Sequence, residues 1–189
     1  MPMLLLVGCG GLALVAILIG LWLVGVYNTL ARGKVGVEGA WADIDVQLKR
    51  RHDLIPNLVE TVKGYAKHER EALEAVIAAR ARAVSAGPID EKIAAEGGLS
   101  AALGRLMAVA EAYPDLKANT NFLQLQGELT STENIISQAR GGYNTTTEGY
   151  NQTLVVFPTN IVANVFGFKA MPFFKVDEES QRNAPQVRF

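Results

Sequence analysis

The 189-residue chain carries 18 Lys and Arg against 19 Asp and Glu, a net charge of −1 with neutral histidines. A nucleic-acid-binding domain would usually be clearly basic, so this balance argues against nucleic acid as a partner. The single cysteine excludes an intramolecular disulfide framework and any zinc site built from several cysteines. Alanine-rich, charged segments predict a helical protein rather than one built from strands.

The N-terminal segment Met3–Val26 contains no charged residue. As a helix it would be about 36 Å long, enough to cross the ~30 Å hydrocarbon core of a bilayer. A cleaved signal peptide begins with basic residues and has a shorter apolar core, so residues 1–26 are predicted to be a transmembrane anchor. The sequence Leu6-Val7-Gly8-Cys9 resembles a lipobox, which leaves a lipid anchor on Cys9 as the alternative.

Residues 27–40 form a juxtamembrane segment that contains Gly33, Gly36 and Gly39. Each glycine costs about 1 kcal/mol relative to alanine inside a helix, so a weak helix or hinge is predicted here. A single rigid rod from the membrane to the soluble part is not expected.

A helical bundle is predicted over residues 41–157, and its first helix presents one apolar face. Trp41, Ile44 and Leu48 have the i, i+3, i+7 spacing of that face, which makes Trp41 a core residue rather than a ligand platform. On the other side, Asp45 and Lys49 are four residues apart and are predicted to form an ion pair.

A break is predicted near His52–Asp53, because Pro56 is tolerated in the first turn of a helix but not in its interior. Asp53 is a good N-cap, so a second helix would run from Leu54 to about Ser85. Its predicted buried face consists of Leu58, Val62, Tyr65, Leu73, Val76 and Ile77.

Ala86-Gly87-Pro88 would end that helix, and residues 90–98 are predicted to be a short mobile link. A third helix is predicted over Leu99–Ala112, followed by a break at Pro114. Its buried face would consist of Leu99, Leu103, Leu106 and Ala110.

The longest element is predicted over Leu116–Phe157, where a heptad repeat predicts a coiled-coil-like seam with a kink at Gly141-Gly142. The recurring residues are Phe122, Leu129, Ile136, Tyr143, Tyr150 and Phe157, and between them lie Leu125, Thr132, Ala139, Thr146 and Thr153.

Pro158 ends this helix. Residues 158–189 are predicted to fold back over the bundle as an extended tail with a short helix or turn. Its aromatic residues are Phe166, Phe168, Phe173, Phe174 and Phe189.

Lys49, Arg50, Arg51 and His52 form a basic run with two interpretations. The run could stabilise the negative end of the first helix and form local ion pairs. It could instead contact anionic lipid or an acidic partner.

A metal site could be assembled from His52, Asp53, His68 and Glu69 with Asp43 or Asp45. The two histidines lack the spacing typical of zinc sites, so solvated, paired helix charges explain these residues better. No nucleophile motif surrounds either histidine, as a hydrolase would require. No catalytic, cofactor-binding or metal-binding residue is predicted, and no cofactor.

Several segments carry a resemblance to a known family. They are DIDVQLKRRHDLIPNLVETVKGYAKHE at residues 43–69, AEAYPDLKAN at 110–119, LTSTENIISQAR at 129–140, the pairs Tyr27-Asn28, Tyr143-Asn144 and Tyr150-Asn151, and FPTNIVA at 157–163. Through them the chain resembles the LemA family over nearly its whole length. The resemblance implies an N-terminal transmembrane helix followed by an elongated antiparallel bundle of about four helices with an extended tail. It implies no reaction, because the family has no established catalytic residues.

The predicted function is a membrane-anchored scaffold or adaptor of the LemA type, without catalytic activity. Its predicted partners are the lipid bilayer, a second copy of the chain and another membrane or envelope protein. Ala16 and Gly20 form a small-residue pair of the kind that lets two membrane helices pack closely. The alternative function is a metal-dependent enzyme or regulator that uses the His, Asp and Glu residues of the stretch 41–69.

The predicted location is the bacterial inner membrane, crossed once. Arg32 and Lys34 follow the anchor, whereas only the α-amino group and Pro2 precede it, which predicts a cytoplasmic bundle. The lipobox-like sequence argues for the opposite side, because lipid-anchored relatives hold their bundles outside the cytoplasm.

Overall fold

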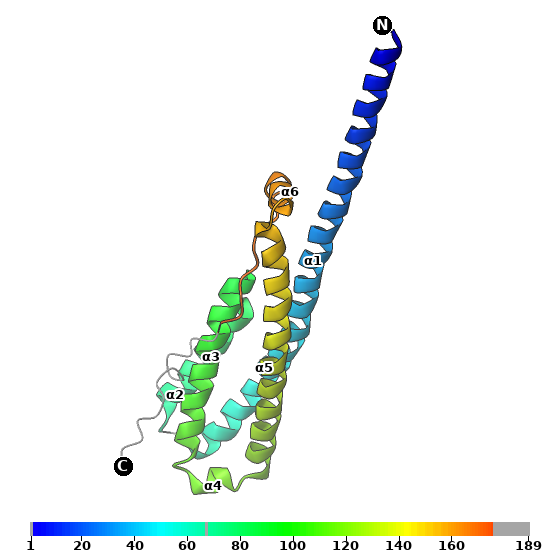
Figure 1. Ribbon diagram of the computed structural model, residues 1–189. Coiled ribbons are helices and arrows are strands. Elements are labelled where there is room, and N and C mark those ends of the chain that lie inside the picture. The colour runs from blue at the N-terminus through cyan, green and yellow to red at the C-terminus, as the bar shows by residue number, and fades with distance from the viewer. Residues whose placement is uncertain (1, 67, 176–189) are drawn as a thin grey trace, which may run out of the picture. The chain divides into compact units, whose positions relative to one another are not determined.

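The computed structural model describes residues 2–66 and 68–175, with side chains from Gly10 onward, and every regular element in this part is a helix (Figure 1). The helices are α1 (Pro2–Tyr65), α2 (Arg70–Ser85), α3 (Ile89–Ala110), α4 (Pro114–Lys117), α5 (Thr120–Val155) and α6 (Thr159–Phe166). The predicted all-α class is confirmed. Two compact units divide the chain: the anchor unit, Met1–Trp41 with Gly142–Met171, and the bundle unit, Ala42–Gly141 with Pro172–Phe189. Helices α1 and α5 contribute to both units.

The bundle unit is held together by one apolar core to which every helix from α1 to α5 contributes. Its buried members are Ile55, Leu58, Val59, Val62 and Ala66 at the end of α1, Leu73, Val76, Ala79 and Ala83 of α2, Leu99, Ala102, Leu106 and Ala110 of α3, Leu116 of α4, and Phe122 and Leu129 of α5. Helix α2 packs along α3. This core confirms a helical bundle after the apolar segment.

The break predicted at His52–Asp53 is wrong, because α1 continues through Pro56 to Tyr65. Proline has no N–H to donate, so the carbonyl group four residues earlier, that of His52, loses its helical partner. Arg80 of α2 replaces the missing donor, since its Nε donates to the His52 carbonyl oxygen at 2.7 Å. A side chain from the neighbouring helix thus compensates for the hydrogen bond that Pro56 removes.

The helix predicted over Leu54–Ser85 is in fact two helices, because a turn that includes His68 separates α1 from α2. Four members of the predicted buried face are buried, namely Leu58, Val62, Leu73 and Val76. Tyr65 and Ile77 are instead 43 % and 53 % exposed. The prediction treated the buried positions as one continuous helical repeat. Because a turn separates α1 from α2, the buried positions of each helix follow their own repeat.

The mobile link predicted over residues 90–98 is also wrong, since α3 begins at Ile89. Asp90 and Glu91 lie in its first turn, where acidic side chains stabilise the positive end of the helix dipole. Ile93 is buried and extends the apolar face of Leu99 and Leu106 towards the start of the helix. The packing of Ile93 therefore accompanies helix in a segment that was predicted to be a mobile link.

The predicted element Leu116–Phe157 is divided into α4 and α5. Asn119 caps the start of α5, because its Oδ1 accepts a hydrogen bond from the Phe122 N–H at 3.0 Å. Helix α5 continues through Gly141 and Gly142. The recurring residues Phe122, Leu129, Ile136, Tyr143 and Tyr150 are buried as predicted. Phe157 lies beyond the end of α5 and is 75 % exposed, so the buried repeat stops at Tyr150.

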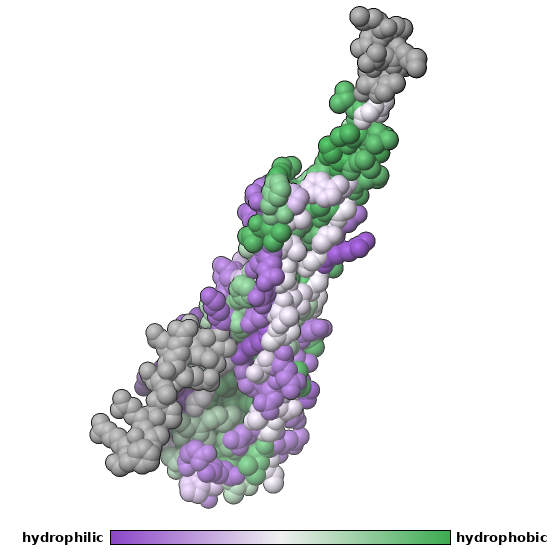
Figure 2. All heavy atoms as spheres, in the orientation of Figure 1, coloured by the Kyte–Doolittle hydropathy of each residue, from purple (hydrophilic) through white to green (hydrophobic). Residues whose placement is uncertain are grey.

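The anchor unit begins with the apolar part of α1, whose side chains lie open on all sides between Gly10 and Gly25 (Figure 2). Its exposed large side chains are Leu12, Leu14, Val15, Ile17, Leu18, Ile19, Leu21, Trp22, Leu23 and Val24. Of the described helices, α1 and α3 are long and apolar enough to span a membrane, and α3 belongs to the bundle core. The uncovered segment of α1 is therefore the one suited to a bilayer.

Of the weak helix or hinge predicted at residues 27–40, the structure has the helix, because α1 is helical throughout this segment. A Cβ atom on residue 33 would stand 3.0 Å from Cδ2 of Tyr150, and one on residue 36 would stand 3.7 Å from Cγ2 of Thr146. Gly33 thus lets Tyr150 of α5 approach α1 closely, whereas a side chain at residue 36 would make an ordinary contact with Thr146. Trp41 is buried, and its ring centroid lies 5.5 Å from that of Tyr143, which confirms it as a core residue.

The Tyr150-Asn151 pair of α5 holds the chain that follows α6. Asn151 donates from Nδ2 to the Met171 carbonyl oxygen and accepts the Met171 N–H at Oδ1, both at 2.9 Å. The Tyr150 hydroxyl donates to the Lys169 carbonyl oxygen at 3.1 Å. The start of the tail is therefore a short helix and then extended chain bound to α5, as predicted, whereas Phe189 lies outside the described residues.

Leu129→Ala should lower the free energy of unfolding by about 2–5 kcal/mol, because it removes a buried side chain and leaves a cavity in the bundle core. Urea unfolding followed by circular dichroism would measure this loss. Ser131→Ala is the matched control, since Ser131 is exposed on the same helix. Equal midpoints for the two variants would contradict the assigned buried face of α5.

Candidate functional site

The bundle unit contains an arginine that is almost completely withdrawn from solvent. Arg51 of α1 is 1 % exposed, and both of its terminal nitrogens are engaged. Nη2 donates to the carboxylate of Glu96 on α3, while Nη1 donates to Ser100 Oγ at 3.0 Å and to Glu133 of α5 at 2.5 Å. An unpaired buried charge would be strongly destabilising, so these acceptors are a condition for burying the guanidinium.

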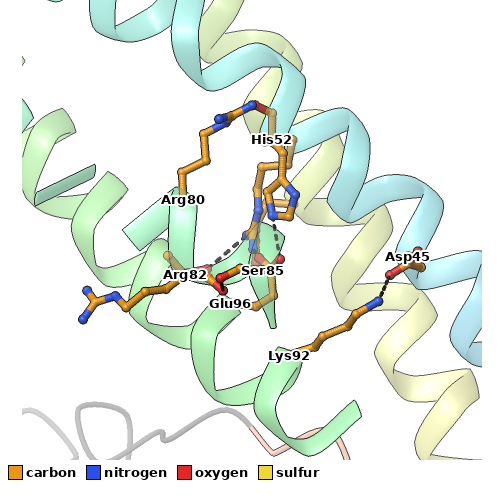
Figure 3. Close-up of polar contacts among 10 residues, drawn as sticks. Asp45, His52, Arg80, Arg82, Ser85, Lys92 and Glu96 are labelled. Atoms are coloured by element: carbon orange, nitrogen blue, oxygen red, sulfur yellow. Dashed lines mark hydrogen bonds and ion pairs between the residues drawn. The ribbon is translucent and has the colours of Figure 1, made fainter. Parts of the chain in front are cut away.

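His52 completes the coordination of Glu96 (Figure 3). Its Nε2 lies 2.7 Å from Glu96 Oε1, while the other carboxylate oxygen accepts from Arg51. Glu96 is itself 1 % exposed. Since an ionised carboxylate only accepts hydrogen bonds, His52 is the donor in this pair. Two neighbouring residues of α1 therefore hold one carboxylate of α3.

The charge state of Glu96 follows from these contacts. Burial alone would raise the pKa of its carboxyl group, but the hydrogen bond from His52 and the positive charge of Arg51 outweigh burial, so the pKa is lowered. Glu96 is consequently ionised at neutral pH, as the pairing with Arg51 requires.

The charged groups continue from Glu133 towards the tail. Arg140 Nη2 lies 3.4 Å from Glu133 Oε1, and the Arg140 guanidinium stands over the Phe174 ring, 4.4 Å from its centroid. The Arg51 network, as we name it, consists of Arg51, His52, Glu96, Ser100, Glu133 and Arg140. It connects α1, α3 and α5, and through Phe174 it reaches the segment after α6.

A cleft of about 280 Å³ adjoins this network. Its lining residues are Asp45, Leu48, Lys49, His52, Asp53, Arg80, Ala83, Val84, Lys92 and Glu96. Lys92 of α3 contacts Asp45 at 2.9 Å, so the ion pair predicted between Asp45 and Lys49 is replaced by one between helices. Cationic and anionic groups alternate around the cleft, and the lining includes no serine, cysteine or threonine that could serve as a nucleophile.

A family model described as the LemA family matches residues 40–189. The chain belongs to the LemA family.

Curated relatives agree with this membership. The chain is 27 % identical to magnetosome protein MamQ 1 of Paramagnetospirillum magneticum, over 79 % of this chain and 64 % of that protein. It is 28 % identical to protein LemA of Metamycoplasma hominis, over 83 % of this chain and 75 % of that protein. The chain thus spans less than two thirds of the length of the MamQ relatives that it matches.

The basic run of this LemA protein is divided between the interior and the surface. Arg51 is buried and His52 largely so, and both contact Glu96 rather than an external group. Arg50 is exposed and lies 3.8 Å from Glu128, and Lys49 is exposed. A role for the run at a helix C-terminus is excluded, since α1 continues to Tyr65. Lys49 and Arg50 are thus the exposed members of the run, while His52 lines the cleft beside Glu96.

The residues considered for a metal site are not brought together. His52 faces Glu96, whereas His68 is exposed in the turn after α1. Glu69 accepts a hydrogen bond from the Tyr113 hydroxyl at 3.0 Å, and Asp53 is exposed. Across residues 2–66 and 68–175, no group of three His, Cys, Asp or Glu side chains is placed to hold a metal ion.

Glu96 and Glu133 were missed in the sequence, although each carries a local signal. Glu96 occupies the i+3 position between Ile93 and Leu99, which places it on the apolar face of α3. Glu133 follows Thr132, a predicted seam residue that is fully buried. An acidic residue on an apolar face indicates a buried cation elsewhere in the chain.

Arg51→Met should lower the free energy of unfolding by about 3–5 kcal/mol, because it leaves the buried Glu96 carboxylate without its main cation. Adding Glu96→Leu should restore part of the loss, and urea unfolding would measure both. Arg50→Met is the matched control, since Arg50 forms an exposed ion pair worth less than about 1 kcal/mol. A loss at Arg51 no larger than that at Arg50 would contradict the role assigned to the network.

Acid should destabilise the bundle through Glu96. Its pKa is lowered by folding, so its contribution is complete above the ordinary carboxyl pKa of about 4.3 and is lost as pH falls through the lower value in the folded state. Unfolding measured between neutral pH and pH ~3 should therefore depend less on pH in Glu96→Gln than in the unmodified protein. Glu74→Gln, which removes an exposed carboxylate of α2, is the matched control.

Proposed function

We propose that this protein is a membrane-anchored, non-catalytic scaffold whose helical bundle binds a second copy of the chain or another membrane or envelope protein. The observation that carries the proposal is the continuity of α1, which is apolar and uncovered at Gly10–Gly25 and supplies core residues of the bundle near Tyr65. One unbroken helix thus belongs both to the segment suited to lipid and to the folded part.

The disposition of charged groups supports a role without catalysis. Arg51 and Glu96 pair inside the bundle unit, Glu133 pairs with Arg51 from a partly exposed position, and His52 contacts Glu96. Charged groups that pair with one another across three helices support a role in holding the bundle together. The candidate ligands of a metal-dependent enzyme face different groups in the described part of the chain, which favours the scaffold over that alternative.

A cleft of about 700 Å³ between α1 and α2 offers the bundle unit a surface for a partner. It is lined by Val59, Glu60, Lys63, Gly64, Arg70, Leu73, Glu74 and Ile77. Ile77 is 53 % exposed at this cleft, where an apolar side chain of a partner would cover it. Three relatives are named magnetosome proteins. Their names are consistent with a membrane-associated role but assign no organelle to this chain.

Photo-crosslinking tests the scaffold role. A photoreactive amino acid at position 77 of the full chain in its native membrane should give a discrete product, either a dimer of the chain or an adduct with one membrane or envelope protein. Position 71, which is exposed on the same helix outside the cleft lining, is the control. Absence of any product specific to position 77 would remove the cleft as the binding surface.

The same proposal places the bundle in the cytoplasm and the anchor in the inner membrane. Arg32 and Lys34 follow the apolar segment within the span over which basic residues determine orientation. In a Cys9→Ala background, Gly87→Cys places a single thiol at the exposed connection between α2 and α3. An impermeant thiol reagent should label this cysteine only after the cells are permeabilised. Labelling of intact cells would instead place the bundle outside the cytoplasm.

A further inference from the structure

A second apolar surface lies in the anchor unit, around the turn from α5 to α6. Its large apolar side chains are Val155, Val156, Phe157, Ile161, Val165 and Phe166, each more than half exposed. We name this set the α6 patch. Helix α6 is only eight residues long, and it turns Val162 and Ala163 inward while Ile161 and Val165 point outward. The side chains of the α6 patch are therefore apolar but are not buried in a hydrophobic core.

The position of the α6 patch along α1 is determined by direct contacts. Val162 and Ala163 pack against Val26 and Leu30 of α1. The Phe166 ring meets the Tyr27 ring edge-on at a centroid distance of 5.1 Å. Phe168 meets the same ring at 5.5 Å, after the chain has turned at Gly167 (φ 72°). The α6 patch therefore lies beside the residues that end the apolar segment.

That level is where a bilayer would end. Met3–Val26 is free of charge, and Arg32 is the first charged residue after it. Arg32 stands about 7–8 Å beyond Tyr27 on a helix that rises ~1.5 Å per residue. Trp22 is partly exposed nearly three turns before Arg32, and aromatic residues of this kind gather where hydrocarbon meets headgroups. Phe166 shares the depth of Tyr27 and so falls within the interfacial layer.

We propose that the α6 patch inserts into the lipid interface beside the transmembrane helix, as a second and monotopic contact with the same leaflet. The proposal rests on the membrane anchoring proposed above. The bilayer is the occupant because the patch adjoins the end of the apolar segment of α1, through the packing of Val162 and Ala163 on Val26 and Leu30. Burying these side chains at the headgroup boundary removes apolar area from water.

The contact would also fix the anchor unit on the membrane. A single transmembrane helix leaves the folded part free to rotate and tilt, whereas a second insertion point a few residues from its end restrains both motions. Because the Tyr150-Asn151 pair holds residues 169 and 171 on α5, the restraint passes to α5 through hydrogen bonds already present.

Lipid-depth quenching tests this proposal in the full chain. In the Cys9→Ala background, Val165→Cys carries a polarity-sensitive fluorophore, and the protein is reconstituted into phosphatidylcholine vesicles with or without doxyl-labelled lipid. Val165 is 73 % exposed, so the label need not disturb packing. Two matched positions on α1 bracket it, Leu21→Cys within the apolar segment and Val35→Cys beyond it, each 65 % exposed.

Loss of fluorescence at position 165 comparable with that at position 21, strongest with a doxyl group near the headgroup, is the expected result. Position 35 should keep its fluorescence. Quenching at 21 but not at 165 would overturn the α6 proposal and leave the anchor intact. No quenching at 21 would overturn the membrane anchor itself. Blue-shifted emission at 165 without lipid quenching would show that protein, such as a second copy of the chain, covers the patch, and would equally refute lipid insertion.

Discussion

Burial of the Arg51 guanidinium is the constraint on which the bundle unit depends. Apolar contacts between helices are non-directional, and small sliding motions change their energy little. A buried guanidinium is different, because its planar fork requires acceptors at defined positions and its desolvation is costly if one is missing. Glu96 from α3 and Glu133 from α5 supply acceptors to its two terminal nitrogens. The network thereby selects one axial and rotational setting of three helices from the many that an apolar core would allow.

Residues whose environment depends on local periodicity could be predicted from the sequence. Trp41, Leu58 and Leu129 are buried because a helical stripe of apolar residues must face a core, and the stripe is visible within a few turns. The errors at Pro56 and at Glu96 have a different origin. Arg80, which repairs the gap left by proline, is 28 residues from His52, and Glu96 is 45 residues from Arg51. Partners at such separations are supplied by the tertiary fold and leave no local pattern.

The glycines of α1 show why helix propensity alone left both a weak helix and a hinge open for residues 27–40. Propensity compares an isolated helix with the unfolded chain, and by that measure Gly33 and Gly36 weaken the helix. Inside the anchor unit the missing side chain of Gly33 leaves room for Tyr150 of α5, so the propensity lost at that position is offset by contact. The same residue type therefore indicates a hinge where a helix stands alone and a close crossing where another helix passes.

The hydrogen bonds between Asn151 and residue 171 imply that these two positions tolerate mutation to different degrees. Asn151 presents its carboxamide to both backbone groups of residue 171, one donor and one acceptor, in the manner of a neighbouring β-strand. Asn151 contacts only main-chain atoms of residue 171 in these hydrogen bonds. They therefore leave the side chain at 171 free to vary during evolution. Position 151 has no such freedom. Aspartate would present a second acceptor to the carbonyl oxygen, leucine would present neither group, and glutamine would place its amide one methylene too far out. Sequence drift is therefore expected to accumulate at 171 while 151 remains asparagine.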